Sequence, residues 1–491
     1  MKQLNFSTSF FKGMFILTLI FCFCDSSQEG KIPLTTSSAE ALKFYRKGID
    51  LFDNLRNQEA LEYFKRAIEK DPEFAVAHLA YGMSSNDLSI FFEELNKALA
   101  LTEKISEGER LTIYGVQAGA SGLLLKQREY YQKLVENYPQ DERAHYLLGN
   151  YLFYQQDFNL AIGEYRRATE INPNYPPAYN MLGYAHRQLE NFDEAEEAFK
   201  RYLEIIPDNP NPYDSYAELL MKKGEFEKSI QNYQKALKID PFFIPSHLGI
   251  ATNLNFLGRH QEAQKNLRAF LQISRTPVES RAALNALIVS FLDESNYPKA
   301  LSINDSLLAM SFQSADTGNI SGNYEIRGNI LQELGNYQEA LQSFQLSHQI
   351  IQQSQLSSDF KANVATISLY HSARIDIATN KLSEAKSKTE ELGRQAETKK
   401  NRNQSWLYHE LLGLIAMQEM NFDESLGEFR RANLQDPYNL FRMAQAYQAK
   451  GDLNQAMKFC ERVVHHNTLN SMSYSVVRHK ARLLLEQIQN L

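Results

Sequence analysis

The sequence predicts an all-α fold, a right-handed superhelical solenoid of about a dozen helix pairs that ends in a C-terminal capping helix. Three observations predict it. Prolines return at a fixed period, each interval between them holds two helical patterns, and small residues and aromatic rings recur at equivalent places. Glycine (22) and proline (14) are sparse in the 491 residues, whereas Tyr (26) and Phe (29) are abundant. Few helix breakers and many rings are typical of helices that pack through large side chains.

The prolines mark the period of the repeat. A proline that follows a run of helix formers ends that helix and fixes the turn into the next one. The strictly spaced prolines lie 34 residues apart, at Pro139, Pro173, Pro207 and Pro241. Related segments end at Pro72 and Pro437, so the repeat extends beyond the regular stretch.

Each interval holds two helices. Between Pro176 and Pro207 the first pattern places Tyr179, Leu182, Gly183 and His186 on one face, at the spacing i, i+3, i+4, i+7. The second pattern presents Ala195 and Phe199, four residues apart. Small residues let the two helices of a unit approach closely, and we expect the ring to fill the gap to the next unit.

This combination of residues resembles the tetratricopeptide repeat (TPR) family. One unit carries the set as Leu148-Gly149, Ala161, Tyr165, Ala168 and Pro173. The resemblance extends from about Glu40 to Leu491. It implies TPR-like helix pairs whose first helices line a concave face, and a protein that holds a partner instead of catalysing a reaction.

One stretch, from about Leu101 to His247, is also similar to the TPR extensions of bacterial sensor kinases, cyclases and winged-helix regulators. This similarity indicates a bacterial protein. An export signal stands here in place of the kinase or DNA-binding domain, so a signalling role does not follow.

The spacing divides the array into blocks. We predict a regular block over 40–275, a degenerate block over 276–472 and a capping helix over 473–491. The spacing drifts after Arg275, and we attribute the drift to lengthened connections at 311–321, 352–359 and 397–404. The cap has one apolar stripe, which the last unit needs to cover its stacking face. Its residues are Val477, Ala481, Leu484, Leu485 and Ile488.

The N-terminus has the pattern of an export signal. Lys2 and Lys12 supply positive charge before the apolar run 14–23, which is too short to span a bilayer comfortably. We predict a signal peptide over 1–26 and a polar linker over 27–39. The predicted location is the periplasm, or the cell envelope as a membrane-anchored lipoprotein.

Cys22 and Cys24 are the candidates for lipidation, because a bacterial lipoprotein signal ends in a cysteine that receives lipid. A small residue should precede that cysteine, whereas Phe precedes both. Cleavage after Ser26 without lipidation is the competing outcome, and both stay open. The body after residue 26 keeps only Cys460, so it has no disulfide framework.

The composition and motifs favour no catalytic chemistry. The net charge of −7 lacks the basic footprint of a nucleic-acid binder, so we expect no nucleic-acid partner. The sequence has no phosphate-cradling glycine loop and no GxSxG, HExxH or CxxC motif. We predict no catalytic residue, no metal site and no cofactor. Cys460 with His465, His466 and His479 is the nearest to a metal cluster, and we interpret it as a packed thiol beside surface histidines.

A peptide-binding groove is predicted on the unpacked side of two first helices. Each candidate lies about 100° around its helix from the packing positions. The candidates are Tyr146, Asn150, Phe153, Tyr154, Asn180, Tyr184, Arg187 and Gln188. Rings supply contact area and amides bond an extended backbone, so the cluster favours a protein or peptide partner. The equivalent residues of the next unit, Asp214, Glu218 and Lys222, are interpreted as a solvated surface.

These observations predict a non-catalytic scaffold or adaptor in the cell envelope. The alternative is a carbohydrate-binding envelope lipoprotein whose exposed rings stack on sugars. An enzyme or a signalling regulator is the least favoured class. The sequence does not determine the oligomeric state.

Overall fold

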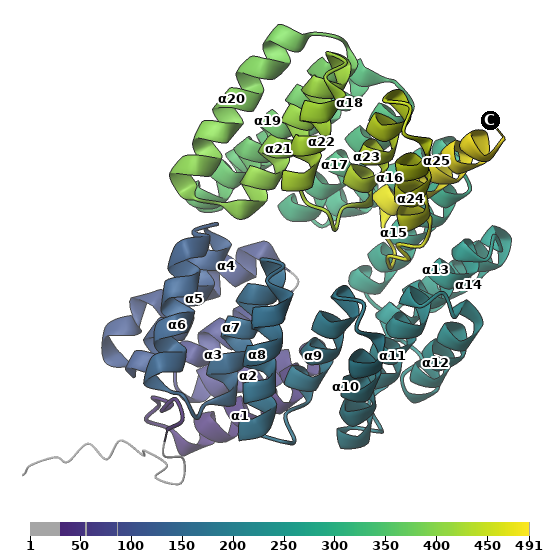
Figure 1. Cartoon of the computed structure of the whole chain (residues 1–491). Coiled ribbons are helices and arrows are strands. Elements are labelled where there is room, and N and C mark those ends of the chain that lie inside the picture. Colours follow the sequence, from purple (N-terminus) through teal and green to yellow (C-terminus); the bar gives the residue numbers. More distant parts are fainter. Residues whose placement is uncertain (1–29, 55, 86, 491) are drawn as a thin grey trace, which may run out of the picture.

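The computed structural model describes residues 30–54, 56–85 and 87–490. In these residues every regular element is a helix, and consecutive helices pair into twelve hairpins followed by one final helix (Figure 1). The predicted all-α solenoid with a capping helix is therefore confirmed.

Seven pairs precede residue 275. They are α1 (Ala39–Asp53) with α2 (Asn57–Lys70), α3 (Ala75–Ser84) with α4 (Leu88–Ala100), α5 (Glu107–Ala120) with α6 (Leu124–Asn137), α7 (Glu142–Tyr154) with α8 (Phe158–Ile171), α9 (Pro176–Gln188) with α10 (Phe192–Ile205), α11 (Pro210–Lys222) with α12 (Phe226–Ile239), and α13 (Ile244–Phe256) with α14 (His260–Ile273). A short 3-10 turn, η1 (Thr102–Lys104), precedes α5.

Five pairs and the cap follow. They are α15 (Pro277–Asp293) with α16 (Tyr297–Gln313), α17 (Thr317–Glu333) with α18 (Tyr337–Gln353), α19 (Ser358–Ala378) with α20 (Leu382–Lys399), α21 (Arg402–Gln418) with α22 (Phe422–Arg431), α23 (Pro437–Ala449) with α24 (Leu453–Val464), and the cap α25 (Met472–Gln489).

Glycine and aromatic residues face each other within a pair. A Cβ atom added to Gly183 of α9 would lie 2.6 Å from the ring of Phe199 in α10, and one added to Gly149 of α7 would lie 2.6 Å from Tyr165 in α8. The ring therefore rests on the glycine of its own unit, a contact beyond the expected one to the next unit. Phe199 also belongs to a cluster with Leu219 of the next first helix, so one ring serves both contacts.

The curvature places the first helix of each pair on the inside of the array. Consecutive first helices contact each other, as α7 contacts α9 and α11 contacts α13, while each second helix packs between two first helices. The odd-numbered helices up to α23 are these first helices, and they line the inner face.

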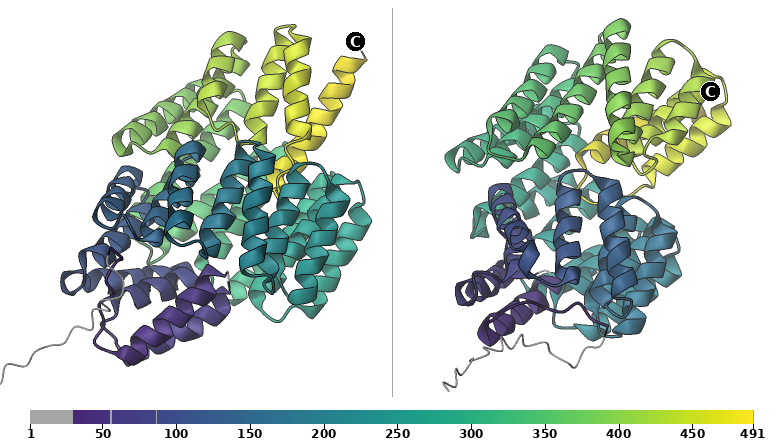
Figure 2. Two further views of the ribbon diagram at one scale, coloured as in Figure 1. Left: turned by 60° about the horizontal axis from the view of Figure 1, so that its bottom comes forward. Right: turned by 90° about the vertical axis from the view of Figure 1, so that its left-hand side faces the viewer.

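The array closes on itself. In Figure 1 the green-to-yellow half, from α17 to α25, stacks on the purple-to-teal half, and Figure 2 shows the two halves together from two further directions. Gln156 and Asn433 lie 277 positions apart in the sequence and are in contact, because the Gln156 amide donates a hydrogen bond to Asn433 Oδ1 at 2.8 Å. We call this contact region the seam. Its residues are Gly122, Gln156, Asp157 and Lys222 on one side and Asn401, Arg402, Asn433 and His466 on the other.

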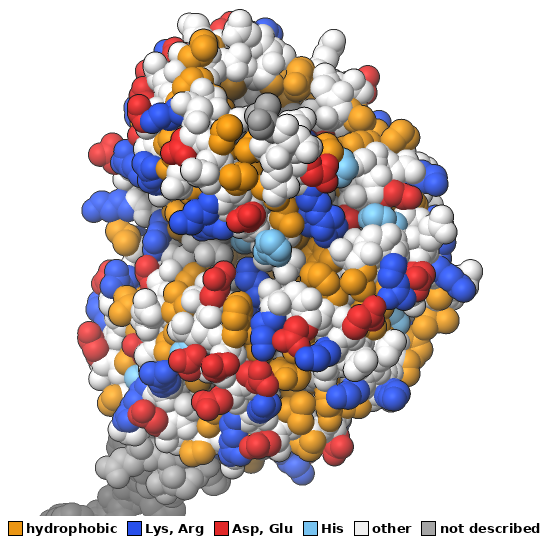
Figure 3. All heavy atoms as spheres, turned by 45° about the vertical axis from the view of Figure 1, so that its right-hand side comes forward, with side chains coloured by type: hydrophobic (Ala, Val, Ile, Leu, Met, Phe, Trp, Pro, Cys, Tyr) orange, Lys and Arg blue, Asp and Glu red, His pale blue; other side chains and the backbone are white. Residues whose placement is uncertain are grey.

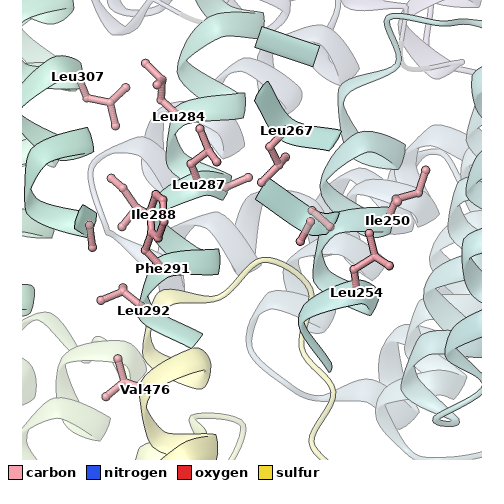
Figure 4. Close-up of a cluster of buried hydrophobic side chains, with 14 of the residues drawn as sticks. Ile250, Leu254, Leu267, Leu284, Leu287, Ile288, Phe291, Leu292, Leu307 and Val476 are labelled. Atoms are coloured by element: carbon pink, nitrogen blue, oxygen red, sulfur yellow. The ribbon is translucent and has the colours of Figure 1, made fainter. Parts of the chain in front are cut away.

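The cap α25 contributes to this closure. Val476 belongs to the same apolar cluster as Phe291 and Leu292 of α15 (Figure 4). Arg478 forms a buried ion pair with Asp293, with 2.7 Å between Nη2 and Oδ2. The cap therefore covers the last unit and also fastens it to the middle of the chain.

The chain enters the array along an extended segment. Ile32 N donates to Asp141 Oδ2 at 2.9 Å and Thr35 N donates to Glu109 Oε1 at 2.8 Å, so residues before α1 run across the starts of α5 and α7. This part of the predicted linker is thus docked on the array. The predicted signal peptide, with Cys22 and Cys24, lies outside the described residues. Within the described residues no helix has the length and apolar content that crossing a membrane requires.

Candidate binding site

Helices α7 and α9 carry the predicted groove residues on the inner face of the array. Tyr146, Asn150, Phe153 and Tyr154 lie on α7, and Asn180, Tyr184, Arg187 and Gln188 lie on α9. The two helices are consecutive first helices, so the structure brings both sets to the same side of the array. The contacts of the eight side chains differ from one end of the helices to the other.

Tyr146 and Asn150 are engaged in packing. The hydroxyl of Tyr165 donates to Asn150 Oδ1 at 2.8 Å. The ring of Tyr146 lies 5.7 Å from that of Tyr175 in an edge contact, and burial raises the pKa of Tyr146 to about 12. These two residues position α7 between its neighbours.

Tyr184 and Arg187 share one carboxylate. The Tyr184 hydroxyl donates to Glu218 Oε1 at 3.1 Å, and Arg187 Nη1 lies 2.8 Å from Glu218 Oε2. The Arg187 guanidinium also lies 4.6 Å from the centre of the Tyr184 ring. The side chain of Glu218 is only 12% exposed, so this carboxylate is part of an internal network and not the solvated residue we expected.

The groove is closed at one end by the first helix pair. Arg143, at the start of α7, forms an ion pair with Asp53 at the end of α1. Nearby, the Asn209 amide donates to the carbonyl of Asn54 at 3.4 Å. The superhelix is wound tightly enough that α1 reaches the starts of α7 and α11, so a ligand has no free passage there.

The other end, where α7 and α9 finish, is open. Tyr154 is 71% exposed, and its ring meets that of Phe153 edge-on at 5.8 Å. Asn180, by contrast, lies near the start of α9, and its buried Oδ1 has no hydrogen-bond partner in the described part of the chain. Gln188 lines a cavity of about 350 Å³ at the seam, together with Lys222 and His466. Tyr154 and Gln188 therefore offer a ring and a side-chain amide to an incoming molecule at this end.

Asp214 is a buried carboxylate whose burial was not predicted from the sequence. It is 2% exposed and accepts a 2.7 Å hydrogen bond from the Ser246 hydroxyl of the next first helix. Burial, followed by the nearby charge of Glu218, raises the pKa of Asp214 well above its ordinary value. The interpretation of Asp214 as a solvated residue was wrong, because its burial depends on a residue 32 positions away.

The cysteine and histidine side chains that the sequence offered as metal ligands or packing residues have structural contacts. Across the described residues no group of three or more His, Cys, Asp or Glu side chains is placed to hold a metal ion. Cys460 is fully buried, and burial raises its pKa to about 11, which leaves the thiol protonated and unreactive. His145 contacts Glu164 at 2.7 Å, and His247 stacks on Phe270 with the ring centres 4.0 Å apart.

The face drawn in Figure 3 carries charges of both signs. Lys and Arg side chains are interspersed with Asp and Glu over both halves of this face. A continuous basic surface, which a nucleic-acid binder needs for phosphate contacts, is not seen on this face.

Comparisons with known proteins identify the repeat. Family models described as tetratricopeptide repeat match residues 45–88, 127–176, 146–210, 211–243 and 438–467. The chain contains tetratricopeptide repeats. The TPR matches fall in both halves of the array and indicate no enzyme family. No curated protein matches the chain.

Several solved structures are similar to this chain at low identity. TTC0263, a thermophilic TPR protein of Thermus thermophilus, is 21% identical over 39% of this chain and 98% of its own, with a TM-score of 0.31. MamA is 20% identical over 35% of this chain and 98% of its own, with a TM-score of 0.29. The Cut9–Hcn1 structure covers 96% of this chain and 79% of its own at 13% identity, with a TM-score of 0.39.

Proposed function

We propose that this chain is a non-catalytic scaffold of the cell envelope that binds an extended segment of a partner protein at the open end of α7 and α9. The observation that carries the proposal is the 71% exposed ring of Tyr154, the last residue of α7, together with Gln188, the last residue of α9, which lines the cavity at the seam. The ring supplies apolar contact area without a large loss of side-chain entropy.

The side-chain amide of Gln188 supplies the polar half of the recognition. A side-chain amide can both accept and donate, and each hydrogen bond to a ligand contributes about 0.5–1.5 kcal/mol. An extended peptide presents backbone N–H groups at regular intervals and matches this amide. Because α1 closes the opposite end, the partner enters from the side of the seam.

The envelope location rests on the N-terminal sequence pattern. The apolar run 14–23 and the two cysteines at its end support export with a lipid anchor on Cys22 or Cys24. Labelling with a radioactive fatty acid tests this directly. Loss of label in Cys22→Ala or in Cys24→Ala identifies the anchor. Absence of label in the wild-type protein indicates an exported protein that carries no lipid.

The binding site is tested by affinity capture from an envelope extract with a matched control. We expect Tyr154→Ala combined with Gln188→Ala to lose the partners that the wild type recovers. The control is Leu160→Ala, since Leu160 is 58% exposed but lies on the second helix α8. Equal recovery by the wild type and the double variant contradicts the assignment of this site.

A carbohydrate partner is the second candidate, favoured by the exposure of Tyr154 alone. Aromatic faces at water-exposed sites stack on apolar faces of sugar rings. A glycan array probed with the wild type and with Tyr154→Ala separates the two functions. A sugar-binding protein gives signals on the array that Tyr154→Ala loses, whereas a peptide-binding protein gives no signals.

A further inference from the structure

A second cavity lies on the inner face of the C-terminal half. Its volume is about 320 Å³, and its walls come from the first helices α15, α17, α19, α21 and α23 together with the cap α25. Five consecutive units thus surround one site, which the cap completes. The cavity is distinct from the groove on α7 and α9, since the two share no residue.

One wall is aliphatic. It consists of Leu292, Ile326, Ile330, Met472 and Val476. Ile330 and Val476 are buried, whereas Asn329 and Ser473 at the edge of the cavity are exposed and leave it open to an incoming molecule. This wall suits a branched aliphatic side chain.

The opposite wall is polar and rigid. Arg442 Nη1 lies 2.6 Å from Glu410 Oε1, with the two side chains 10% and 4% exposed. The Tyr370 hydroxyl donates to the same carboxylate. Burial acts to raise the pKa of Glu410, but the guanidinium groups of Arg442 and Arg374 outweigh it and lower the pKa. These groups satisfy one another and hold the wall in one arrangement.

Arg374 and Asp436 keep hydrogen-bonding capacity in this wall. Arg374 lies one helical turn from Tyr370, with its guanidinium 5.4 Å from the centre of that ring, and it makes no hydrogen bond or ion pair within the described residues. Asp436 accepts a hydrogen bond from Tyr438 N at 2.9 Å through Oδ1, and within the same residues its other oxygen has no partner. The cavity therefore offers one free cation and one free acceptor opposite an aliphatic wall.

We propose that this cavity binds a ligand that combines an aliphatic side chain, a carboxylate and an adjacent N–H group. The carboxylate pairs with Arg374, whose planar guanidinium matches it in a bidentate manner. The N–H donates to Asp436, and the side chain covers Ile330 and Val476. A free aliphatic amino acid has this chemistry, and so does the C-terminal residue of a peptide.

The size of the cavity agrees with such a ligand. Small-molecule sites span about 300–1,000 Å³, so this cavity belongs to the smallest of them and holds about one residue. A longer peptide extends out past Asn329 and Ser473. The experiment below distinguishes a free amino acid from the C-terminal residue of a peptide.

The test is isothermal titration of the full chain with four probes. The probes are N-acetylleucine, N-acetylleucinamide, leucine and the tripeptide Gly-Gly-Leu. We expect N-acetylleucine to bind, and the amide, which lacks the carboxylate, to bind at least about tenfold more weakly. Tighter binding of leucine than of Gly-Gly-Leu assigns the site to free amino acids, and the reverse order assigns it to chain ends; both orders support the proposal.

Variants test the residues. Arg374→Gln should weaken N-acetylleucine binding about tenfold or more, and Asn329→Trp should obstruct the opening with a similar loss. Arg374→Gln also weakens the electrostatic support of the buried Glu410, so the melting temperature of each variant is measured to show that it is folded under the titration conditions. The control Arg394→Gln alters an arginine that is 65% exposed on the second helix α20 and should bind normally. Absence of binding by all four probes, equal binding of acid and amide, or normal binding by Arg374→Gln overturns the proposal.

Discussion

At the scale of single residues, the contact between a glycine and a ring determines how closely two helices of a unit approach. The ring of Phe199 occupies the space where a Cβ atom of Gly183 would lie. A larger residue at Gly183 must displace either the ring or the helix, because the core has little free volume. The glycine is therefore required for space.

Gly183→Ala should destabilise the protein by about 1–3 kcal/mol through overpacking. The matched control is Gly163→Ala in α8, where no heavy atom of the described residues lies within 4 Å of the added Cβ. This control should stabilise the protein by about 0.5–1 kcal/mol, because alanine favours the helix more than glycine. Urea unfolding measures both; a neutral or stabilising effect of Gly183→Ala contradicts the packing account.

His371 gives stability a pH dependence. It stacks on Phe344 with ring centres 4.0 Å apart, and burial followed by the charge of Arg374 lowers its pKa from 6.5 to about 3. Between pH 6.5 and 3 the unfolded chain binds a proton that the folded chain does not. Stability should thus fall as the pH falls through this range, by about 1.4 kcal/mol per pH unit from this residue.

The measurement is the free energy of unfolding from pH 4 to pH 8. His371→Phe keeps the ring stack and should lose this contribution to the slope, whereas His479→Gln, at an exposed position of α25, should retain it. An unchanged slope in His371→Phe shows that the buried imidazole is not responsible.

The sequence predicted residues well where their environment is local. Gly183 and Phe199 follow from the repeat, and so does the burial of Cys460 in place of an aromatic ring. Asp214 and Arg442 could not be predicted in this way, because their partners Ser246 and Glu410 belong to other units. Charged residues on an inner face look solvated until the winding of the superhelix is known.

At the scale of helices, a change in helix length explains why the 34-residue spacing of the prolines ends at Pro241. Helices α7 to α14 have 13 or 14 residues each, which produces the strict period of 34. Helices α15 to α21 have 17 to 21 residues. The longer repeat beyond residue 275 thus comes from longer helices, whereas we expected longer connections; the segment 311–321 is mostly helical.

The cap depends on one buried ion pair. Arg478→Met should destabilise the protein by about 3 kcal/mol, because it leaves the buried carboxylate of Asp293 with the contact to His260 but without its guanidinium. The double variant Arg478→Met with Asp293→Leu should recover part of this loss, since it removes both charges. Urea unfolding of the three variants gives the comparison. A double variant no more stable than Arg478→Met shows that packing of α25, and not charge burial, dominates.

At the scale of the whole molecule, the closed shape could not be predicted from the repeat. Equal units predict an open solenoid, whereas closure depends on small rotations that accumulate between units. The contact between Gln156 and Asn433, or between Lys222 and the carbonyl of His466, has no local signature in the sequence. The side of the predicted groove could be derived from helical spacing, but its closure by α1 could not.

The seam should respond to charge reversal. Arg402 lies 2.9 Å from Asp157 across the seam, and both are partly exposed. Arg402→Glu places two carboxylates there and should increase the maximum dimension in small-angle scattering at low salt. The free energy of unfolding should change by about 1 kcal/mol or less, since exposed ion pairs contribute little. The control Arg430→Glu, on α22, should leave the dimension unchanged. Identical scattering of Arg402→Glu and the wild type contradicts a role of this pair in closure.

The central claim is that a partner binds on the inner face of the array, at the open end of α7 and α9. Photo-crosslinking tests it most directly, with p-benzoylphenylalanine placed either at Tyr154 on the first helix α7 or at Leu160 on the second helix α8. Both side chains are largely exposed, so the two probes differ mainly in the face they occupy. The account predicts crosslinks to the captured partner from position 154 and none from position 160. Crosslinks from position 160 alone would contradict it.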